Sequence, residues 1–146
     1  MQSVIPGLTR DPCTAMKANL LDRHPCPCGK PLTLPQCCGR YIGTDTPAPD
    51  AESLMRSRYS AFVLMDREYL LQTWHPSKRP AQLELDPATR WLGLEVRGRR
   101  QADATHAEVE FVARCRDASG KATRIHERSR FVNENGRWFY LDGDMP

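Results

Sequence analysis

The chain has 146 residues, of which 40% are hydrophobic and 27% are charged, and its formal net charge is +3. This length suits one domain with a small accessory module and excludes a large multidomain enzyme. Because no run of about 18 apolar residues occurs and the positive charge is small, we expect neither a membrane nor a nucleic acid among its partners.

Residues 1–21 precede the first motif and are interpreted as a disordered or dispensable leader. Their first part lacks the basic start and the apolar run of a signal peptide. Met16 offers a second start site, so either Met1 or Met16 begins the functional chain. The lack of a secretory signal predicts a cytoplasmic protein, in which cysteines are kept reduced.

Four cysteines with the spacing C-x-C-x8-C-C are the strongest motif of the sequence: Cys26, Cys28, Cys37 and Cys38. In a reducing compartment, clustered cysteines indicate a metal site rather than disulfides. Four thiolates close the tetrahedral shell that zinc prefers and leave no position for a catalytic water. The pattern therefore predicts a structural Zn²⁺ in a small knuckle at residues 22–42, which needs its metal to fold. An iron–sulfur cluster and a redox thiol pair are the alternatives.

The pattern CPCG…CCG resembles the SEC-C motif, a small zinc module at the tail of the SecA translocation ATPase. In that tail the module is associated with binding partner proteins and the ribosome. The resemblance therefore implies a protein partner for the knuckle. This sequence departs from the SecA pattern between the two cysteine pairs, where it has one lysine, Lys30, in place of several.

A linker and a helical region follow the knuckle. Residues 43–49 are polar and contain prolines, which is typical of a linker. Asp50 then offers an N-cap for a helix. The buried stripe of this helix has the helical period and consists of Met55, Tyr59 and Phe62. We expect helix to continue, with a break near Asp66, until His75, which precedes a proline.

From Trp91 onward the apolar period changes to two, as in β-strands. The residues expected to face the core are Leu92, Leu94 and Val96, then Val109, Phe111, Ala113 and Cys115, then Ile125, Glu127, Ser129 and Phe131. Turns at 117–120 and 133–136 separate these strands from one another and from a last strand at 138–141. Helices followed by an antiparallel meander predict an α+β fold.

This order of elements resembles the cone of the nuclear-transport-factor-2-like (NTF2-like, also SnoaL-like) superfamily, in which helices close over a curved antiparallel sheet and leave a pocket. The motifs that add to the resemblance are LMRSRYSAF (54–62), TWHP (73–76), WLGLEV (91–96), FVAR (111–114), HERSRF (126–131) and ENGRWFYLDG (134–143). With CPCG…CCG they resemble the YchJ-like family of bacterial proteins. The resemblance implies a SEC-C-like knuckle followed by a SnoaL-like domain at 50–146.

The knuckle and this domain are expected to be independent. The linker is polar, and roughly a hundred residues can bury a core unaided, whereas the knuckle depends on its metal. We therefore expect zinc removal to unfold the knuckle alone.

The candidate pocket of the cone consists of Arg56, Arg58, His75 and Glu127. Glu127 shares the core-facing phase of its strand, and a buried carboxylate needs a partner or a raised pKa. We expect an ion pair with Arg56 or Arg58, and a ligand-orienting or general-base role is the alternative. His75 titrates near neutral pH, although at a helix end it also suits a structural role.

A basic stripe lies on the opposite face of the same strand and consists of Arg124, His126, Arg128 and Arg130. Charge pairing across strands with Glu108 and Glu110 is its expected role. Phosphate binding is the alternative, although no glycine-rich loop accompanies the stripe.

Two functions follow from these features. The first, which we favour, is a non-enzymatic zinc protein whose knuckle contacts another protein and whose cone holds a partner or a small ligand. The second is a small-molecule binder or an enzyme that uses the cone pocket, although no catalytic residue can be assigned from spacing alone. An open pocket above ~300 Å³ with convergent polar groups would favour the second function.

Overall fold

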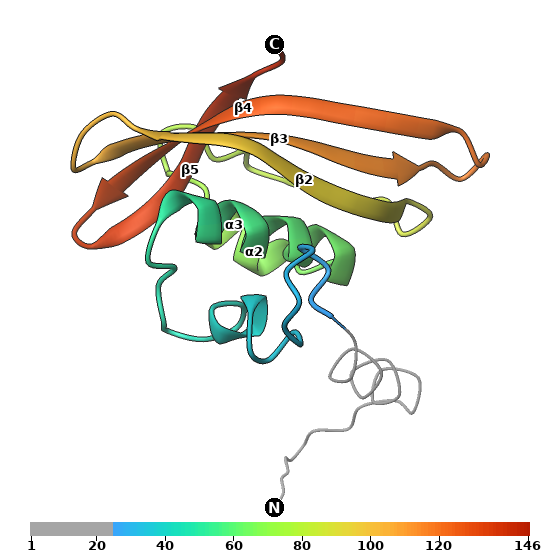
Figure 1. The fold of residues 1–146 in the computed structure, drawn as a ribbon, viewed down its shortest axis with the longest axis horizontal. Coiled ribbons are helices and arrows are strands. Elements are labelled where there is room, and N and C mark those ends of the chain that lie inside the picture. The colour runs from blue at the N-terminus through green and yellow to red at the C-terminus, as the bar shows by residue number, and fades with distance from the viewer. Residues whose placement is uncertain (1–24) are drawn as a thin grey trace, which may run out of the picture.

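The computed structural model describes residues 25–146. The predicted leader at 1–21, the choice between Met1 and Met16, and residues 22–24 of the predicted knuckle lie outside this range. The elements are η1 (Cys38–Arg40), α2 (Ala51–Leu64), α3 (Arg67–Gln72), β2 (Arg90–Gln101), β3 (His106–Arg116), β4 (Ala122–Glu134) and β5 (Arg137–Asp144). Figure 1 shows three layers, with the sheet above the helices and the cysteine knuckle (residues 25–42) below α2.

Both α-helices begin at an aspartate. The side chains of Asp50 and Asp66 accept hydrogen bonds of 2.7 and 3.0 Å from the backbone N–H three residues later, which satisfies a free donor of each first turn. Met65 ends α2 in the left-handed conformation, with φ 61°. The predicted helix and its break near Asp66 are confirmed. In the described part of the chain, no helix combines the length and the apolar character needed to cross a membrane.

The segment after α3 pairs with β5 instead of extending the helix as predicted. Trp74 forms a β-bridge with Tyr140. The Tyr140 N–H donates to the Thr73 carbonyl, and the His75 N–H donates to the Tyr140 carbonyl, both at 2.8 Å. These bonds satisfy backbone groups that a longer helix would otherwise use, and they fix the Trp74 side chain beside the sheet.

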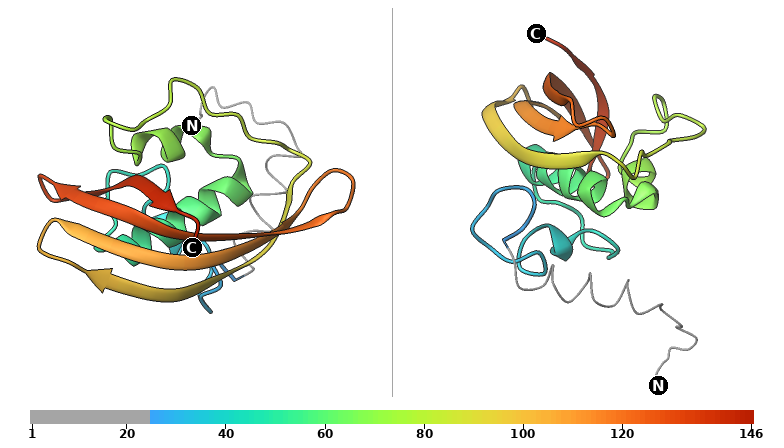
Figure 2. Two further views of the ribbon diagram at one scale, coloured as in Figure 1. Left: turned by 90° about the horizontal axis from the view of Figure 1, so that it is seen from above. Right: turned by 90° about the vertical axis from the view of Figure 1, so that its right-hand side faces the viewer.

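The sheet is antiparallel with the strand order β2-β3-β4-β5. It bends around α2, and both helices cover the same face (Figure 2). Strands β4 and β5 are joined at Asn135 and Gly136, whose φ angles of 55° and 84° suit a two-residue hairpin turn. Helices packed on one face of an antiparallel sheet make this an α+β fold, as predicted.

Strand β2 contains a β-bulge near its start, and the residues there face the opposite sides of the sheet from those predicted. The register with β3 shifts between Trp91 and Gly93, and Leu92 is the extra residue. Leu92 is 52% exposed, whereas Trp91 packs inward, with its ring 5.7 Å from that of Phe62. Strict alternation predicted the reverse. A bulge shifts the phase of all residues before it, and periodicity alone does not reveal the shift.

The core lies between α2 and the concave face of the sheet, and its most buried large side chains are Leu54, Leu70, Val109 and Phe131. Two residues that precede α2 belong to the same core. Tyr41 of the knuckle and Ala48 of the predicted linker are 6% and 7% exposed. The knuckle is therefore packed on the domain, which favours joint unfolding, whereas the predicted independence on zinc removal stays a prediction.

Candidate metal centre and buried pocket

Two glycines shape the cysteine knuckle. Gly29 has a φ of 97°, a conformation that favours glycine, and its N–H donates to the Cys26 carbonyl at 3.1 Å. At Gly39 a Cβ atom would lie 2.6 Å from the Leu34 carbonyl oxygen. A larger residue at Gly39 would therefore clash with the Leu34 backbone, so backbone conformation explains the glycine of CPCG and lack of space explains that of CCG.

The knuckle brings its four thiols into one buried cluster: the Sγ atoms of Cys26, Cys28, Cys37 and Cys38 all lie within 4.8 Å of one another. Sulfur ligands of a tetrahedral site with metal–sulfur bonds of ~2.3 Å lie about 3.8 Å apart. The Sγ atoms of Cys28 and Cys37 are 3.6 Å apart. The arrangement therefore fits a metal ion held by four thiolates.

The environment of these thiols disfavours several negative charges without a cation. Burial raises the pKa of Cys37 to about 11. Hydrogen bonds with Cys26 and Cys28 raise the pKa of Cys38, whereas hydrogen bonds with Cys28 and Cys38 lower the pKa of Cys26. Hydrogen bonding within the cluster thus lowers the pKa of Cys26 and raises that of Cys38. A divalent cation would instead stabilise all four thiolates at once.

The knuckle contacts the side of α2 that faces away from the sheet. The Arg56 Nη1 donates a 2.8 Å hydrogen bond to the Cys28 carbonyl, and the Ser60 Oγ lies 3.5 Å from the Cys26 Sγ. The apolar residues packed against the cysteines are Leu34, Ile42 and Leu94. Ser57 and Ser60 are completely buried. Helix α2 is therefore enclosed on two sides, by the knuckle and by the core.

On its other side, α2 covers a cavity of about 280 Å³. The apolar part of its wall includes Met55, Tyr59, Phe62, Leu83, Trp91 and Phe111. The polar side chains in the wall are Arg58, Trp74, Glu127, Ser129 and Tyr140. The volume lies just below the ~300 Å³ expected of small-molecule sites, whereas a mostly apolar wall with a few polar groups is their usual composition.

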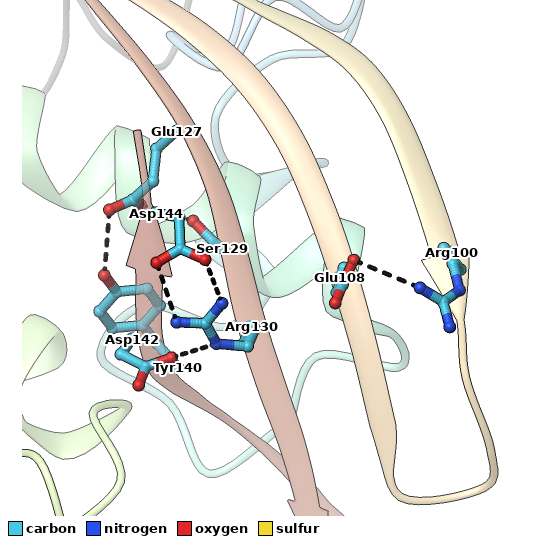
Figure 3. Close-up of polar contacts among 8 residues, drawn as sticks. All are labelled: Arg100, Glu108, Glu127, Ser129, Arg130, Tyr140, Asp142 and Asp144. Atoms are coloured by element: carbon cyan, nitrogen blue, oxygen red, sulfur yellow. Dashed lines mark hydrogen bonds and ion pairs between the residues drawn. The ribbon is translucent and has the colours of Figure 1, made fainter. Parts of the chain in front are cut away.

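Glu127 of β4 lines this cavity and is held by two hydroxyl groups. Figure 3 shows its contact with Tyr140. Ser129 Oγ donates to its Oε1 at 2.6 Å, and the Tyr140 hydroxyl donates to its Oε2 at 3.3 Å. Burial and the adjacent Glu127 charge raise the pKa of Tyr140. The phenol therefore remains a hydrogen-bond donor at neutral pH. A Cβ atom at Gly143 would lie 2.6 Å from the Glu127 carboxyl carbon, so this glycine makes room for the carboxylate.

Arg58 lies beside Tyr140 and Trp74 in the same wall. Its Nη1 donates to the Leu70 carbonyl and to the Thr73 hydroxyl at the end of α3, both at 2.7 Å. Its guanidinium carbon lies 4.6 Å from the centre of the Tyr140 ring and 5.3 Å from that of Trp74. Burial lowers the pKa of Arg58 to about 10, which leaves it positive at neutral pH.

The pairing predicted for Glu127 is different in the structure. No arginine lies within ion-pair distance of Glu127 among residues 25–146, and the hydroxyls of Ser129 and Tyr140 take that place. Arg58 shares the cavity with Glu127 but directs its hydrogen bonds to the end of α3.

The other two residues of the predicted pocket, Arg56 and His75, do not line the cavity. Two helical positions correspond to a rotation of about 200°, so Arg56 lies on the knuckle side of α2 and Arg58 on the cavity side. Arg56 pairs with Glu52 at 2.8 Å. The His75 Nε2 lies 2.8 Å from a carboxylate oxygen of Glu134, near the surface. The candidate pocket therefore requires correction at both positions.

Sequence reasoning missed Trp74 and Tyr140 as pocket residues. The Trp74 Nε1 is buried and has no hydrogen-bond partner among the described residues, and its side chain lines the cavity. A buried donor without an acceptor costs ~1–3 kcal/mol. The TWHP segment gave no indication of this, because the position of Trp74 depends on the pairing of its backbone with β5.

The outer face of the sheet carries paired charges over much of its area, although only Glu110 of the two predicted partners contacts the basic stripe. The Glu110 carboxylate lies 2.7 Å from His126 and 3.6 Å from Arg128. Arg130 donates at 2.6 Å to both Asp142 and Asp144, and Arg100 lies 3.8 Å from Glu108 (Figure 3). Charge pairing across strands therefore accounts for the basic stripe, except at Arg124.

Comparison with known sequences supports the same architecture. Residues 50–143 match the family profile described as "YchJ, middle NTF2-like domain". A UPF0225 protein of Polaromonas sp. is 61% identical over 137 residues, which covers 88% of this chain and 99% of the relative. A UPF0225 protein of Bordetella pertussis is 59% identical over 133 residues, which covers 89% of this chain and 99% of the relative.

Two solved structures have the same fold over 84% of this chain, each at 33% sequence identity. The solution structure of a SEC-C motif containing protein from Rhodopseudomonas palustris has a TM-score of 0.75 and is covered over 99% of its length. The crystal structure of a SEC-C motif containing protein from Psychrobacter arcticus has a TM-score of 0.70 and is covered over 83%. From its NTF2-like domain, its cysteine cluster and these relatives, the chain belongs to the YchJ-like family.

Proposed function

We propose that this protein is a zinc-stabilised binder of a small molecule. One structural Zn²⁺, held by the four thiolates of the cysteine knuckle, fixes the knuckle against α2. The ion would supply cross-linking and charge neutralisation without chemistry on a ligand, because four cysteines fill a tetrahedral shell. Such a site requires reduced thiols, which agrees with the predicted cytoplasmic location.

The observation that carries the proposal is the unused hydrogen-bonding capacity of two polar side chains in the cavity wall, Trp74 and Glu127. The buried Trp74 Nε1 has no acceptor among the described residues, and the Glu127 carboxylate can accept more hydrogen bonds than the two it receives. The remainder of the wall is mainly apolar. The ligand expected from this arrangement is a compact, mostly apolar molecule, with an acceptor for Trp74 and a donor for Glu127.

Thermal-shift and calorimetric titrations with a library of small amphipathic fragments would test this proposal. Trp74→Phe and Glu127→Gln should each weaken binding about tenfold, the effect of one lost hydrogen bond to a buried group. Ala113→Leu should block binding because Ala113 lines the cavity. Trp138→Phe is the matched control, because Trp138 is buried outside the cavity wall.

Two outcomes would change the assignment. Fragments that bind equally well to all of these variants would refute the cavity as the ligand site. Turnover of a bound compound that Glu127→Gln abolishes would instead assign an enzyme, with Glu127 as the general base.

A protein contact through the knuckle is the second candidate function, and an exposed leucine favours it. Leu32 lies between the two cysteine pairs and is 40% exposed, whereas the four cysteines are buried. Its side chain is therefore available to a partner protein. If the knuckle binds a partner, Leu32→Ser should abolish capture of that partner while the metal content stays unchanged. Capture that is equal with Leu32→Ser and with the wild type would exclude this surface.

A further inference from the structure

Arginines that face one another gather at one end of the outer sheet face. The strand register puts Arg90 directly opposite Arg116, and Arg114 directly opposite Arg124. Like charges at such positions destabilise a sheet. Among the ion pairs of residues 25–146, Arg114 alone of the four has a carboxylate partner, Glu95 at 3.7 Å. The cluster therefore imposes a repulsion that the fold leaves largely uncompensated.

The β-bulge of β2 places an apolar side chain among these arginines. Leu92 lies between Trp91, which pairs with Cys115, and Gly93, which pairs with Arg114. Its side chain is 52% exposed. A Cβ atom added at Gly93 would have no heavy atom within 4 Å, so the surface beside Leu92 is open. Bulges commonly turn a side chain to the other face of a sheet, and here the bulge turns a leucine away from the core.

We propose that these five residues, here called the arginine patch (Arg90, Leu92, Arg114, Arg116 and Arg124), bind an acidic segment of a partner protein. The carboxylates of that segment would pair with the guanidinium groups, which bind carboxylates in a bidentate manner. One apolar side chain of the segment would pack on Leu92. Arginine around a buried apolar contact is a common composition of protein interfaces.

The charges around the arginine patch support an acidic partner. The Glu95 carboxylate is shared with Arg97 at 3.4 Å, so it neutralises little of the patch. Elsewhere on the same face, Glu110, Asp142 and Asp144 already neutralise their neighbours. The unpaired positive charge of the face is thus concentrated where the exposed leucine lies.

The same residues favour a protein segment over a nucleic acid. Binding of single strands uses exposed aromatic rings on which bases stack. The exposed large apolar residues of the described chain are Leu32, Met65, Leu92 and Met145, none of which is aromatic. A free phosphate would leave Leu92 without a role. The arginine patch lies on the sheet face opposite the cavity, so the inference does not depend on the proposed ligand.

Fluorescence anisotropy with the full chain and a labelled peptide of glutamates around one leucine would test the proposal. Arg124→Gln should weaken binding about tenfold at low salt, and added salt should reduce the difference. Leu92→Ser should weaken binding by a factor that salt changes little. Arg100→Gln is the matched control, since Arg100 is an exposed arginine on the same strand as Leu92, outside the arginine patch.

A stability measurement supplies a second readout. Because Arg124→Gln removes a like-charge pair, it should raise the urea midpoint at low salt while it weakens peptide binding. Equal peptide binding by Arg124→Gln and Arg100→Gln would overturn the proposal. Tighter binding of single-stranded DNA or inorganic phosphate with the same dependence on Arg124 would also overturn it and would assign the patch to a phosphate ligand.

Discussion

The Arg56 side chain donates a 2.8 Å hydrogen bond to the main-chain carbonyl of Cys28 and so connects α2 to the first cysteine pair. The same guanidinium also binds Glu52 at 2.8 Å. A helix that carries part of the cavity wall is therefore joined directly to the candidate metal centre. The state of the cysteine cluster must influence the stability of α2 through this contact.

Arg56→Ala should destabilise the protein by about 1–3 kcal/mol, because the Cys28 carbonyl and Glu52 each lose a charged partner. It should also speed the transfer of the metal to a chelator, because the knuckle loses its polar contact with α2. Urea unfolding and the rate of metal release would measure the two effects. The control is Arg97→Ala, which removes an arginine from a more exposed pair with Glu95. Equal effects of the two substitutions would contradict a specific role for Arg56.

Elemental analysis of protein purified under reducing conditions should find about one Zn²⁺ per chain. Cys37→Ser should lower this content, whereas Cys115→Ser should leave it unchanged, because Cys115 lies on β3 outside the cysteine cluster. Iron in place of zinc, or no metal, would contradict the proposed centre.

Chelation should loosen more than the knuckle. Because Ile42 and Leu94 pack against both the cysteine cluster and the core, amide exchange should rise in α2 as well, and the unfolding midpoint of the whole chain should fall. Unchanged amide exchange in α2 would contradict this coupling and would support the predicted independence of the knuckle and the domain.

Much of the fold follows from local patterns in the sequence. The aspartate caps mark the starts of both helices, and the period of two places β3 and β4 with their correct faces. The cysteine cluster is recognisable from its spacing, and the chain reverses locally between the two pairs, at Gly29 and through the bridge between Pro25 and Thr33. These features were predictable because each is determined within a few residues.

The positions that could not be predicted depend on contacts between distant segments. Alternation predicts that Leu92 faces the core. The bulge that turns it outward depends on the pairing between β2 and β3, which the sequence does not show. Arg56 was assigned to the pocket because the sequence does not show that the knuckle covers one side of α2. Trp74 was overlooked because its environment arises from pairing with β5.

The stability of the protein should fall as the solution is acidified below about pH 4.3, the pKa of an unperturbed glutamate. Although burial opposes ionisation, hydrogen bonds from Arg56 and Arg99 lower the pKa of Glu52 below its usual value. A lowered pKa in the folded state stabilises the protein fully above the unfolded pKa, and this contribution is lost as the pH falls through the folded pKa. Glu52→Gln should flatten the acid side of a plot of urea midpoint against pH. Glu84→Gln is the control and should leave the plot unchanged, because Glu84 is exposed and outside the ion pairs of the described residues. A matching change in both variants would contradict this role of Glu52.

Gly143→Ala should displace the Glu127 side chain, because the new methyl group would lie 2.6 Å from its carboxyl carbon. Glu127 would then lose its hydrogen bonds with Ser129 and Tyr140, at a cost of about 1–3 kcal/mol, and ligand binding should weaken as in Glu127→Gln. Gly98→Ala is the control, since a Cβ atom there meets nothing within 4 Å. Ligand binding that survives Gly143→Ala unchanged would argue against Glu127 as a ligand contact.

The most direct test of the account is the ¹H–¹⁵N signal of the Trp74 indole during titration with fragments. The chain has three tryptophans, so Trp74→Phe identifies the signal. A fragment in the cavity should shift the Trp74 indole signal and slow its proton exchange, because Nε1 gains an acceptor, and should leave the Trp138 signal in place. Binding fragments that shift only signals of the knuckle or of the outer sheet face, with the Trp74 signal unchanged, would contradict the cavity as the functional site.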